Sequence, residues 1–132
     1  NGDLLWREPY HLTGPFIVPS PVLGNDNRLF VSCAYEGDSR CFQLTRNGES
    51  TTTEKLWEMK QLRVHHSNVM RIGDYVYGPH GDFGPKIFTA VDIKTGDVVW
   101  RDRRLERVNT LFADGKLIAL DEKGTLFLAE QD

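Results

Sequence analysis

Short apolar runs alternate with turns that contain glycine along most of the chain. From residue 20 onward, each run is rich in β-branched and aromatic residues and stops at a cluster of Gly, Asn, Asp or Ser. No segment keeps an apolar period of 3.6 residues over three helical turns. The pattern therefore predicts an all-β chain built from short antiparallel strands.

The clearest predicted element is a β-hairpin near the end of the chain. Residues 88–93 predict a strand, Thr95 and Gly96 a tight turn, and residues 97–100 a second strand that ends on an aromatic residue. A turn of this kind needs a residue that takes a positive φ, which glycine does without strain. The fixed positions of the hairpin have the spacing Ala-x-Asp-x-x-Thr-Gly-x-x-x-Trp and are Ala90, Asp92, Thr95, Gly96 and Trp100.

Part of this pattern recurs earlier in the sequence. Gly2-x-x-x-Trp6 repeats the second half of the spacing, and Trp57 ends another predicted strand. The three tryptophans are 51 and 43 residues apart, and a period of about 40 to 50 residues with four strands per unit is typical of propeller blades. We expect one domain of residues 1–132 that forms a partial β-propeller of about three four-stranded blades.

The predicted blades have these limits: residues 1–8 are the last strand of a blade, 20–60 and 67–103 are complete blades, and 108–130 are an incomplete blade. Free strand edges template further pairing. We therefore expect the first six residues to pair with the incomplete blade, or the chain to associate with other blades or with a second copy.

The hairpin spacing resembles the tryptophan-docking motif of the pyrroloquinoline-quinone-type β-propeller repeat family. Further segments similar to that family are His65-His66-Ser67, Gly73-Asp74-Tyr75-Val76-Tyr77-Gly78 and Ala113-Asp114-Gly115-Lys116-Leu117. The resemblance covers about residues 20–130, and the chain is similar to the C-terminal portion of the non-catalytic, BamB-like members. It implies a protein-interaction scaffold without a cofactor, in the periplasm or another extracytoplasmic compartment.

In a propeller, the tryptophans have a structural role. Each blade packs face to face with the next, so Trp6, Trp57 and Trp100 should bury their rings between blades. Each indole N–H then needs an acceptor in the following blade. We expect a structural role as well for the motif residues of the hairpin and for Gly124 in a later turn.

Composition narrows the range of partners. The chain has 132 residues, of which 39% are hydrophobic, enough for one domain with a core. Its net charge of -3 gives no electrostatic reason to expect nucleic acid or an anionic membrane surface. No apolar run reaches the length of a membrane span. The partners expected are a protein or other blades.

Cys33 and Cys41 admit two interpretations. If the intervening turn is centred on Gly37, the two cysteines face each other across a hairpin, and a disulfide is possible in an oxidising compartment. In the alternative, both are buried thiols that fill small gaps.

Four residues are candidates for a binding site. His65 and His66 adjoin a strand start, and His80 and Asp82 lie in the glycine-rich segment 78–85. Loops at one end of a propeller converge, so these side chains could line a polar pocket, bind a metal ion or be ordinary loop residues. Adjacent residues in an extended segment point to opposite sides, so only one histidine of the pair should join a given site.

Catalytic motifs are not evident in the sequence. The quinoprotein dehydrogenases of the same repeat family hold calcium and the quinone with Glu, Asn and Asp side chains and carry an adjacent cysteine pair, whereas Cys33 and Cys41 are separated. The charged segment 101–107 interleaves both signs, which favours self-paired charge over an anionic partner. The function expected is non-enzymatic. The alternatives are a segment of a quinone-dependent dehydrogenase and a carbohydrate-binding propeller, the latter suggested by Tyr10, Tyr35 and Phe83.

Overall fold

The protein consists of three antiparallel sheets. The structure is a computed structural model and describes residues 2–10, 18–84 and 86–130. Eleven strands and no helix occur in these ranges, which confirms the all-β prediction. Within the same ranges, there is no helix with the length and apolar character needed to cross a membrane.

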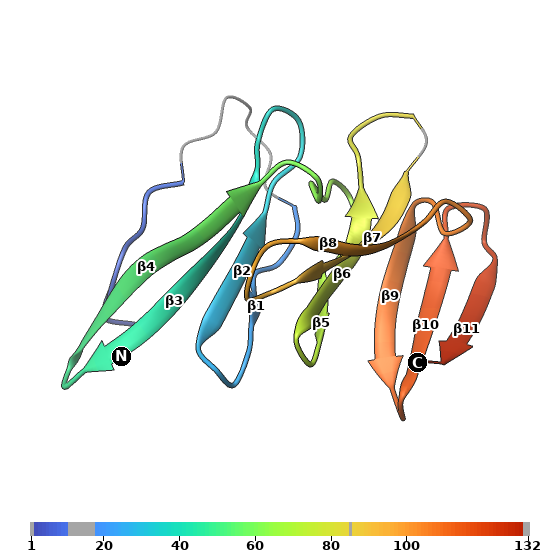
Figure 1. Cartoon of the computed structure of the whole chain (residues 1–132). Helices are drawn as coiled ribbons and strands as arrows, with labels where there is room; N and C mark the ends of the chain where they lie inside the picture. Colours follow the sequence, from blue (N-terminus) through green and yellow to red (C-terminus); the bar gives the residue numbers. More distant parts are fainter. Residues whose placement is uncertain (1, 11–17, 85, 131–132) are drawn as a thin grey trace.

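The sheets follow one another along the chain, and strands that pair are also neighbours in sequence. The first sheet has the order β1-β2-β3-β4, the second β5-β6-β7-β8 and the third β9-β10-β11. Figure 1 shows them side by side in this order, from left to right. The strand bounds are β1 Val22–Leu23, β2 Arg28–Ser32, β3 Ser39–Asn47, β4 Ser50–Met59, β5 Met70–Ile72, β6 Tyr75–His80, β7 Ile87–Asp92, β8 Val98–Asp102, β9 Val108–Ala113, β10 Lys116–Asp121 and β11 Leu126–Glu130.

Two hydrophobic cores hold the sheets together. The larger core joins the first and second sheets through residues that include Phe30, Val76 and Val91. The smaller core joins the second and third sheets through Phe88, Val108 and Ala119. The second sheet is therefore buried on both faces, because successive side chains of its middle strands point to opposite sides. This double burial explains why β7 reads as a continuous apolar run rather than an alternating one.

Trp57 connects the first sheet to the second. Its indole Nε1 donates a hydrogen bond to the carbonyl oxygen of Ile93 at 3.0 Å, which confirms the predicted acceptor in the next sheet. The ring lies against Gly96 in the β7–β8 turn, where a Cβ atom would be 2.9 Å from Cδ2 of the indole. Opposite Trp57 in the β3–β4 ladder is Cys41, and the register shifts at this point, so that Leu56 is left unpaired as in a β-bulge.

The close approach of Trp57 to Gly96 predicts that Gly96→Ala destabilises the protein by about 2–4 kcal/mol, because a methyl group would strain a backbone at φ 80° and also collide with the indole. Gly124→Ala is the matched control. Gly124 has φ 83° but open space around it, so about 1–2 kcal/mol is expected there. Urea denaturation of both variants measures the difference, and equal losses would contradict the contact.

Trp100 does not repeat the environment of Trp57. Trp100 lies opposite Ala90 in the β7–β8 ladder, next to a register shift like the one beside Trp57. However, Trp100 remains 44% exposed, and its ring meets Phe88 edge to face at a centroid distance of 6.1 Å. The turn that covers Trp57 is the β7–β8 turn, which follows the third strand of the second sheet. Gly124 lies in the β10–β11 turn, which follows the second strand of the third sheet, so it does not cover Trp100 in the same way. The expectation that Trp100 buries its ring between blades as Trp57 does is therefore wrong for the described residues.

The N-terminal segment is not a strand. Residues 2–10 form no ladder, Trp6 is 36% exposed, and the third sheet contains only β9, β10 and β11 within the described chain. The segment instead contacts the first sheet, where Thr53 Oγ1 donates a hydrogen bond to Glu8 Oε2 at 2.7 Å. The prediction that residues 1–8 form a strand paired with the third sheet is therefore wrong for the described residues. Asn1 lies outside these residues.

The two cysteines do not form a disulfide. Phe30 lies opposite Cys41 in the ladder, while the backbone N–H of Cys33 donates to the carbonyl of Asp38. The turn is therefore centred between residues 35 and 36 rather than on Gly37, and the predicted facing pair is wrong. Both thiols are buried, as the alternative interpretation predicts.

A charged contact also joins the first two sheets. Asp26 in the β1–β2 turn accepts hydrogen bonds from both terminal nitrogens of Arg71 on β5, at 2.8 and 2.9 Å. It also accepts from the guanidinium of Arg28 at 3.0 Å and from the backbone N–H of Arg28 at 3.2 Å. The hydrogen bonds from Arg71 hold the pKa of the Asp26 carboxyl well below its usual range. Gly24 leaves room for the guanidinium, because a Cβ atom there would lie 1.8 Å from Arg71 Nη1.

This contact predicts a pH dependence of stability. A carboxyl whose pKa is lowered by folding stabilises the protein above its unfolded pKa of about 3.9 and loses that contribution as the pH falls toward the folded value. We expect Asp26→Asn to cost about 1 kcal/mol at pH 7, a modest value because the side chain is 33% exposed. Urea denaturation should show this difference shrinking below about pH 4, and a constant difference from pH 7 to 3 would contradict the assignment.

Candidate functional site

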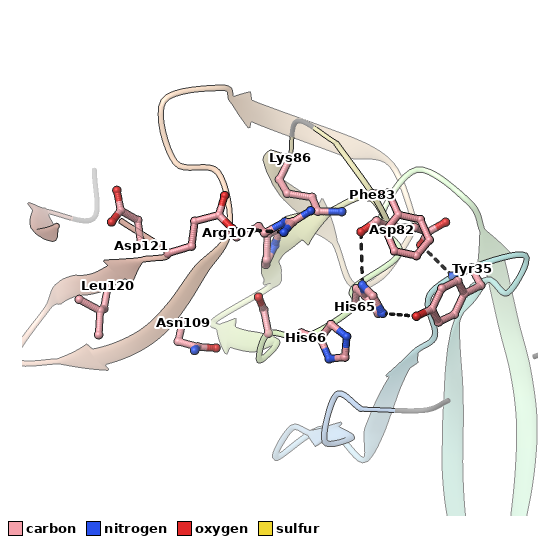
Figure 2. A pocket seen from close by; sticks show the side chains of 14 residues that line it. Tyr35, His65, His66, Asp82, Phe83, Lys86, Arg107, Asn109, Leu120 and Asp121 are labelled. Atoms are coloured by element: carbon pink, nitrogen blue, oxygen red, sulfur yellow. Dashed lines mark hydrogen bonds and ion pairs between the residues drawn. The ribbon is translucent and has the colours of Figure 1, made fainter. Parts of the chain in front are cut away.

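A pocket lies at the end of the molecule where loops from all three sheets meet. Its volume is about 420 Å³. The wall contains Tyr35 from the β2–β3 loop, residues 65–67 between the first and second sheets, residues 81–83 from the β6–β7 loop, Lys86, and residues around β9 and β10. Figure 2 shows these side chains around one space. The expected convergence of loops at one end is therefore present.

Tyr35 forms a rigid part of the wall. Its backbone has φ 57°, an unfavourable value for a residue with a side chain. The N–H donates to Asp82 Oδ1 at 2.7 Å, the carbonyl accepts from Arg63, and Arg63 pairs with Asp82 at 3.2 Å. These contacts tie the β2–β3 loop of the first sheet to the β6–β7 loop of the second and fix the tyrosine ring beside the pocket.

His65 is held in one tautomer behind this wall. Its Nδ1 lies 3.3 Å from the backbone carbonyl of Asp82, and Nε2 lies 2.7 Å from the hydroxyl of Tyr35. A carbonyl only accepts, so Nδ1 carries the proton and Nε2 accepts from the hydroxyl. Burial and the neighbouring His66 lower the pKa of His65, which keeps the ring neutral at pH 7.

His66 shares the pocket with His65, contrary to the expectation that only one of the pair would. Their ring centroids are 3.7 Å apart, and both residues line the space. The expectation fails because residues 65–67 form a bend instead of an extended strand, so successive side chains do not alternate. His66 is exposed, and its ring is the part of the pair that a ligand can reach.

His80 lies outside the pocket. The glycine-rich segment starts as part of β6, which continues to His80, and Nδ1 of this residue accepts the backbone N–H of Arg63 at 3.0 Å. Burial lowers its pKa, followed by the positive charge of Arg63. Three of the four predicted residues, His65, His66 and Asp82, are thus brought together, and His80 supports them through Arg63.

Metal binding finds no support in the geometry. In the described ranges, no three His, Cys, Asp or Glu side chains are placed to hold one ion. The hydrogen bonds of His65 and Asp82 go to the pocket wall instead. The position of His65, His66 and Asp82 in the pocket wall agrees with the polar-pocket interpretation.

Lys86 is the residue that sequence reasoning missed. It is only 4% exposed, and its ammonium group has no hydrogen-bond or ion-pair partner among the described residues. Burial, and then the charge of Arg107, lower its pKa. The one signal in the sequence is position, because Lys86 directly precedes the apolar run Ile87-Phe88-Thr89-Ala90-Val91 that forms β7.

The acidic groups of the pocket already have partners. Asp82 pairs with Arg63, and Glu122 pairs with Arg107 at 3.2 Å. Asp121 accepts two backbone N–H groups in the β10–β11 turn, from Lys123 and Thr125. Lys86 is therefore the cation of the described pocket that lacks a counter-ion.

Comparison with known proteins gives no family assignment. No family model matches the chain, and no curated protein matches its sequence. The resemblance of the hairpin motif to a propeller repeat therefore stays an expectation, and a functional interpretation depends on the geometry of the sheets and the pocket.

Proposed function

We propose that this chain is a non-enzymatic β-propeller repeat module of the quinone type that acts as a protein-interaction scaffold. The observation that carries the proposal is the docking of Trp57 on the β7–β8 turn of the next sheet. This contact is head to tail, because one sheet supplies an indole and the following sheet supplies a turn. Successive four-stranded sheets joined face to face in this way are consistent with blades arranged around an axis.

A binding role is supported by the pocket at the loop end. Residues from loops of successive sheets form the pocket wall. Proteins commonly bind their partners through loops that a rigid scaffold holds in position. The histidine and carboxylate that could serve in acid–base chemistry, His65 and Asp82, are engaged in holding Tyr35 in place. With the motif resemblance, this favours a scaffold in the periplasm or another extracytoplasmic compartment, with a protein, other blades or a second copy as partner.

Site-specific crosslinking tests the scaffold role. A photo-reactive amino acid at position 66, on the pocket rim, should capture a discrete protein in the native host, whereas the same group at position 49 should not. Glu49 is an exposed residue in the β3–β4 turn and serves as the control. No adduct from position 66, or the same adducts from both positions, would contradict the proposal.

A cofactor titration separates the scaffold from a dehydrogenase segment. We expect no stoichiometric, calcium-dependent optical shift when pyrroloquinoline quinone and calcium are added to the full chain. Such a shift would replace the scaffold with a segment of a quinone-dependent enzyme.

A further inference from the structure

We infer that the pocket binds a carboxylate carried on an apolar or aromatic body, with the ammonium group of Lys86 as its counter-ion. The inference rests on the proposed scaffold function and deepens it, since it names the chemical group by which a protein partner would be recognised. That group is the C-terminal carboxylate of a segment, or an Asp or Glu side chain, next to an apolar residue.

The first argument is the state of Lys86. Removing an ammonium group from water is unfavourable unless a counter-ion or hydrogen bonds compensate it. Lys86 is 4% exposed, and no described residue forms a hydrogen bond or an ion pair with its ammonium group. Figure 2 shows its side chain reaching inward between Arg107 and Asp82. A bound anion would supply the missing partner.

The second argument is the balance of charge around Lys86. The pocket is lined by three carboxylates, Asp82, Asp121 and Glu122, and by the cations Lys86 and Arg107. Asp82 and Glu122 are each paired with an arginine. Asp121 is held by two backbone N–H groups of its own turn. Within the described chain, Lys86 is left as a cation without an ion-pair partner, and a monoanion would supply one. A phosphate dianion would bring a second negative charge close to these carboxylates with no cation to balance it.

The third argument is the apolar part of the wall. Phe83 is 75% exposed although its ring lies 5.7 Å from that of Tyr35. Leu120, on the opposite side of the pocket, is 48% exposed. These surfaces would be covered by a hydrophobic group next to the carboxylate, and Tyr35 is already fixed in position by its backbone contacts. A small hydrophilic anion would leave them uncovered.

The test uses two probes that differ in one charge. N-acetylphenylalanine carries a carboxylate next to an aromatic ring, and N-acetylphenylalaninamide has the same ring without the charge. In NMR titrations of the full chain, we expect the acid to give saturable shifts at the amides of residues 65–67 and 81–84, and the amide to bind at least ten-fold more weakly. Equal binding, or no binding of the acid, would overturn the inference. Inorganic phosphate that binds more tightly than the acid would overturn it as well.

Variants assign the effect to Lys86. Lys86→Gln should weaken the acid at least ten-fold, and Lys94→Gln should leave its affinity unchanged, because Lys94 is exposed and pairs with Asp74 away from the pocket. Undiminished acid binding by Lys86→Gln would overturn the role of Lys86. If this variant fails to fold, the acid and amide probes still decide the question on the unchanged chain.

Two peptides distinguish the sources of the carboxylate. One ends in phenylalanine with a free C-terminus, and the other has an internal Glu beside phenylalanine and an amidated end. At least one should compete with the acid probe, and competition by neither would overturn recognition of a protein carboxylate. If none of the acids binds, the carboxylate inference is wrong but the scaffold role is not contradicted. If quinone binds in a calcium-dependent manner, the scaffold role is wrong, and the comparison of the acid with the amide probe still tests carboxylate binding.

Discussion

Replacement of Trp57 by alanine is expected to lower the free energy of unfolding by about 3–5 kcal/mol, the range for an aromatic side chain removed from a packed interface. The indole contacts Phe30 within its own sheet, at a centroid distance of 6.0 Å, and Gly96 and Ile93 in the next. Its loss opens a cavity between the first two sheets and leaves a carbonyl without its donor. Equilibrium denaturation in urea, followed by tryptophan fluorescence and circular dichroism, measures the change.

Two companion variants separate packing from hydrogen bonding. Trp57→Phe keeps an aromatic ring but not the N–H, so a loss of roughly 1–3 kcal/mol is expected. Trp100→Ala removes a tryptophan that is 44% exposed and should cost about 1 kcal/mol or less. If Trp100→Ala were as damaging as Trp57→Ala, the two tryptophans would be equivalent after all, against the geometry described above.

Replacement of Phe88 by alanine is expected to cost about 3–5 kcal/mol as well, for a different interface. Phe88 is fully buried, stacks with Tyr77 at 6.4 Å and lies against Val108 and Ala119 of the third sheet. It is the largest buried side chain of the smaller core, so few neighbours can close the cavity. The same urea experiment applies.

Phe83→Ala is the matched control for Phe88→Ala. The Phe83 ring is 75% exposed, and a change within about 0.5 kcal/mol is expected. A loss below about 1 kcal/mol for Phe88→Ala would mean that the third sheet is held by contacts other than this core.

Strand existence could be predicted from the sequence, whereas exact register could not. Strands and glycine turns are encoded locally, and the β7–β8 hairpin forms where its motif predicts. Register depends on turn centres and bulges. The β2–β3 turn is offset from Gly37, which removed the predicted pairing of the cysteines. Leu56 and Val99 are left out of their ladders by register shifts that no glycine marks in the sequence.

Contacts between segments that are far apart in the sequence could be predicted only in part. His65, His66 and Asp82 were predictable because loops at one end of successive sheets converge. The N-terminal segment carries strand-like residues, but a strand needs a partner, and its contacts with β4 are side-chain contacts outside a ladder. Lys86 was missed because a lysine in a loop is usually solvated, and its burial depends on three sheets meeting around it.

The unequal size of the two cores bears on how the molecule opens. In the described part of the chain, nine buried residues join the first and second sheets, and three join the second and third. In proteins of stacked repeats, each unit is stabilised mainly by its immediate neighbours, so the weaker junction is the first to separate. Amide hydrogens of β9–β11 should exchange with solvent through sub-global opening while the other two sheets stay protected. Since Arg107 and Leu120 belong to that region, a ligand that spans the pocket would act as a clamp on the least stable part of the molecule.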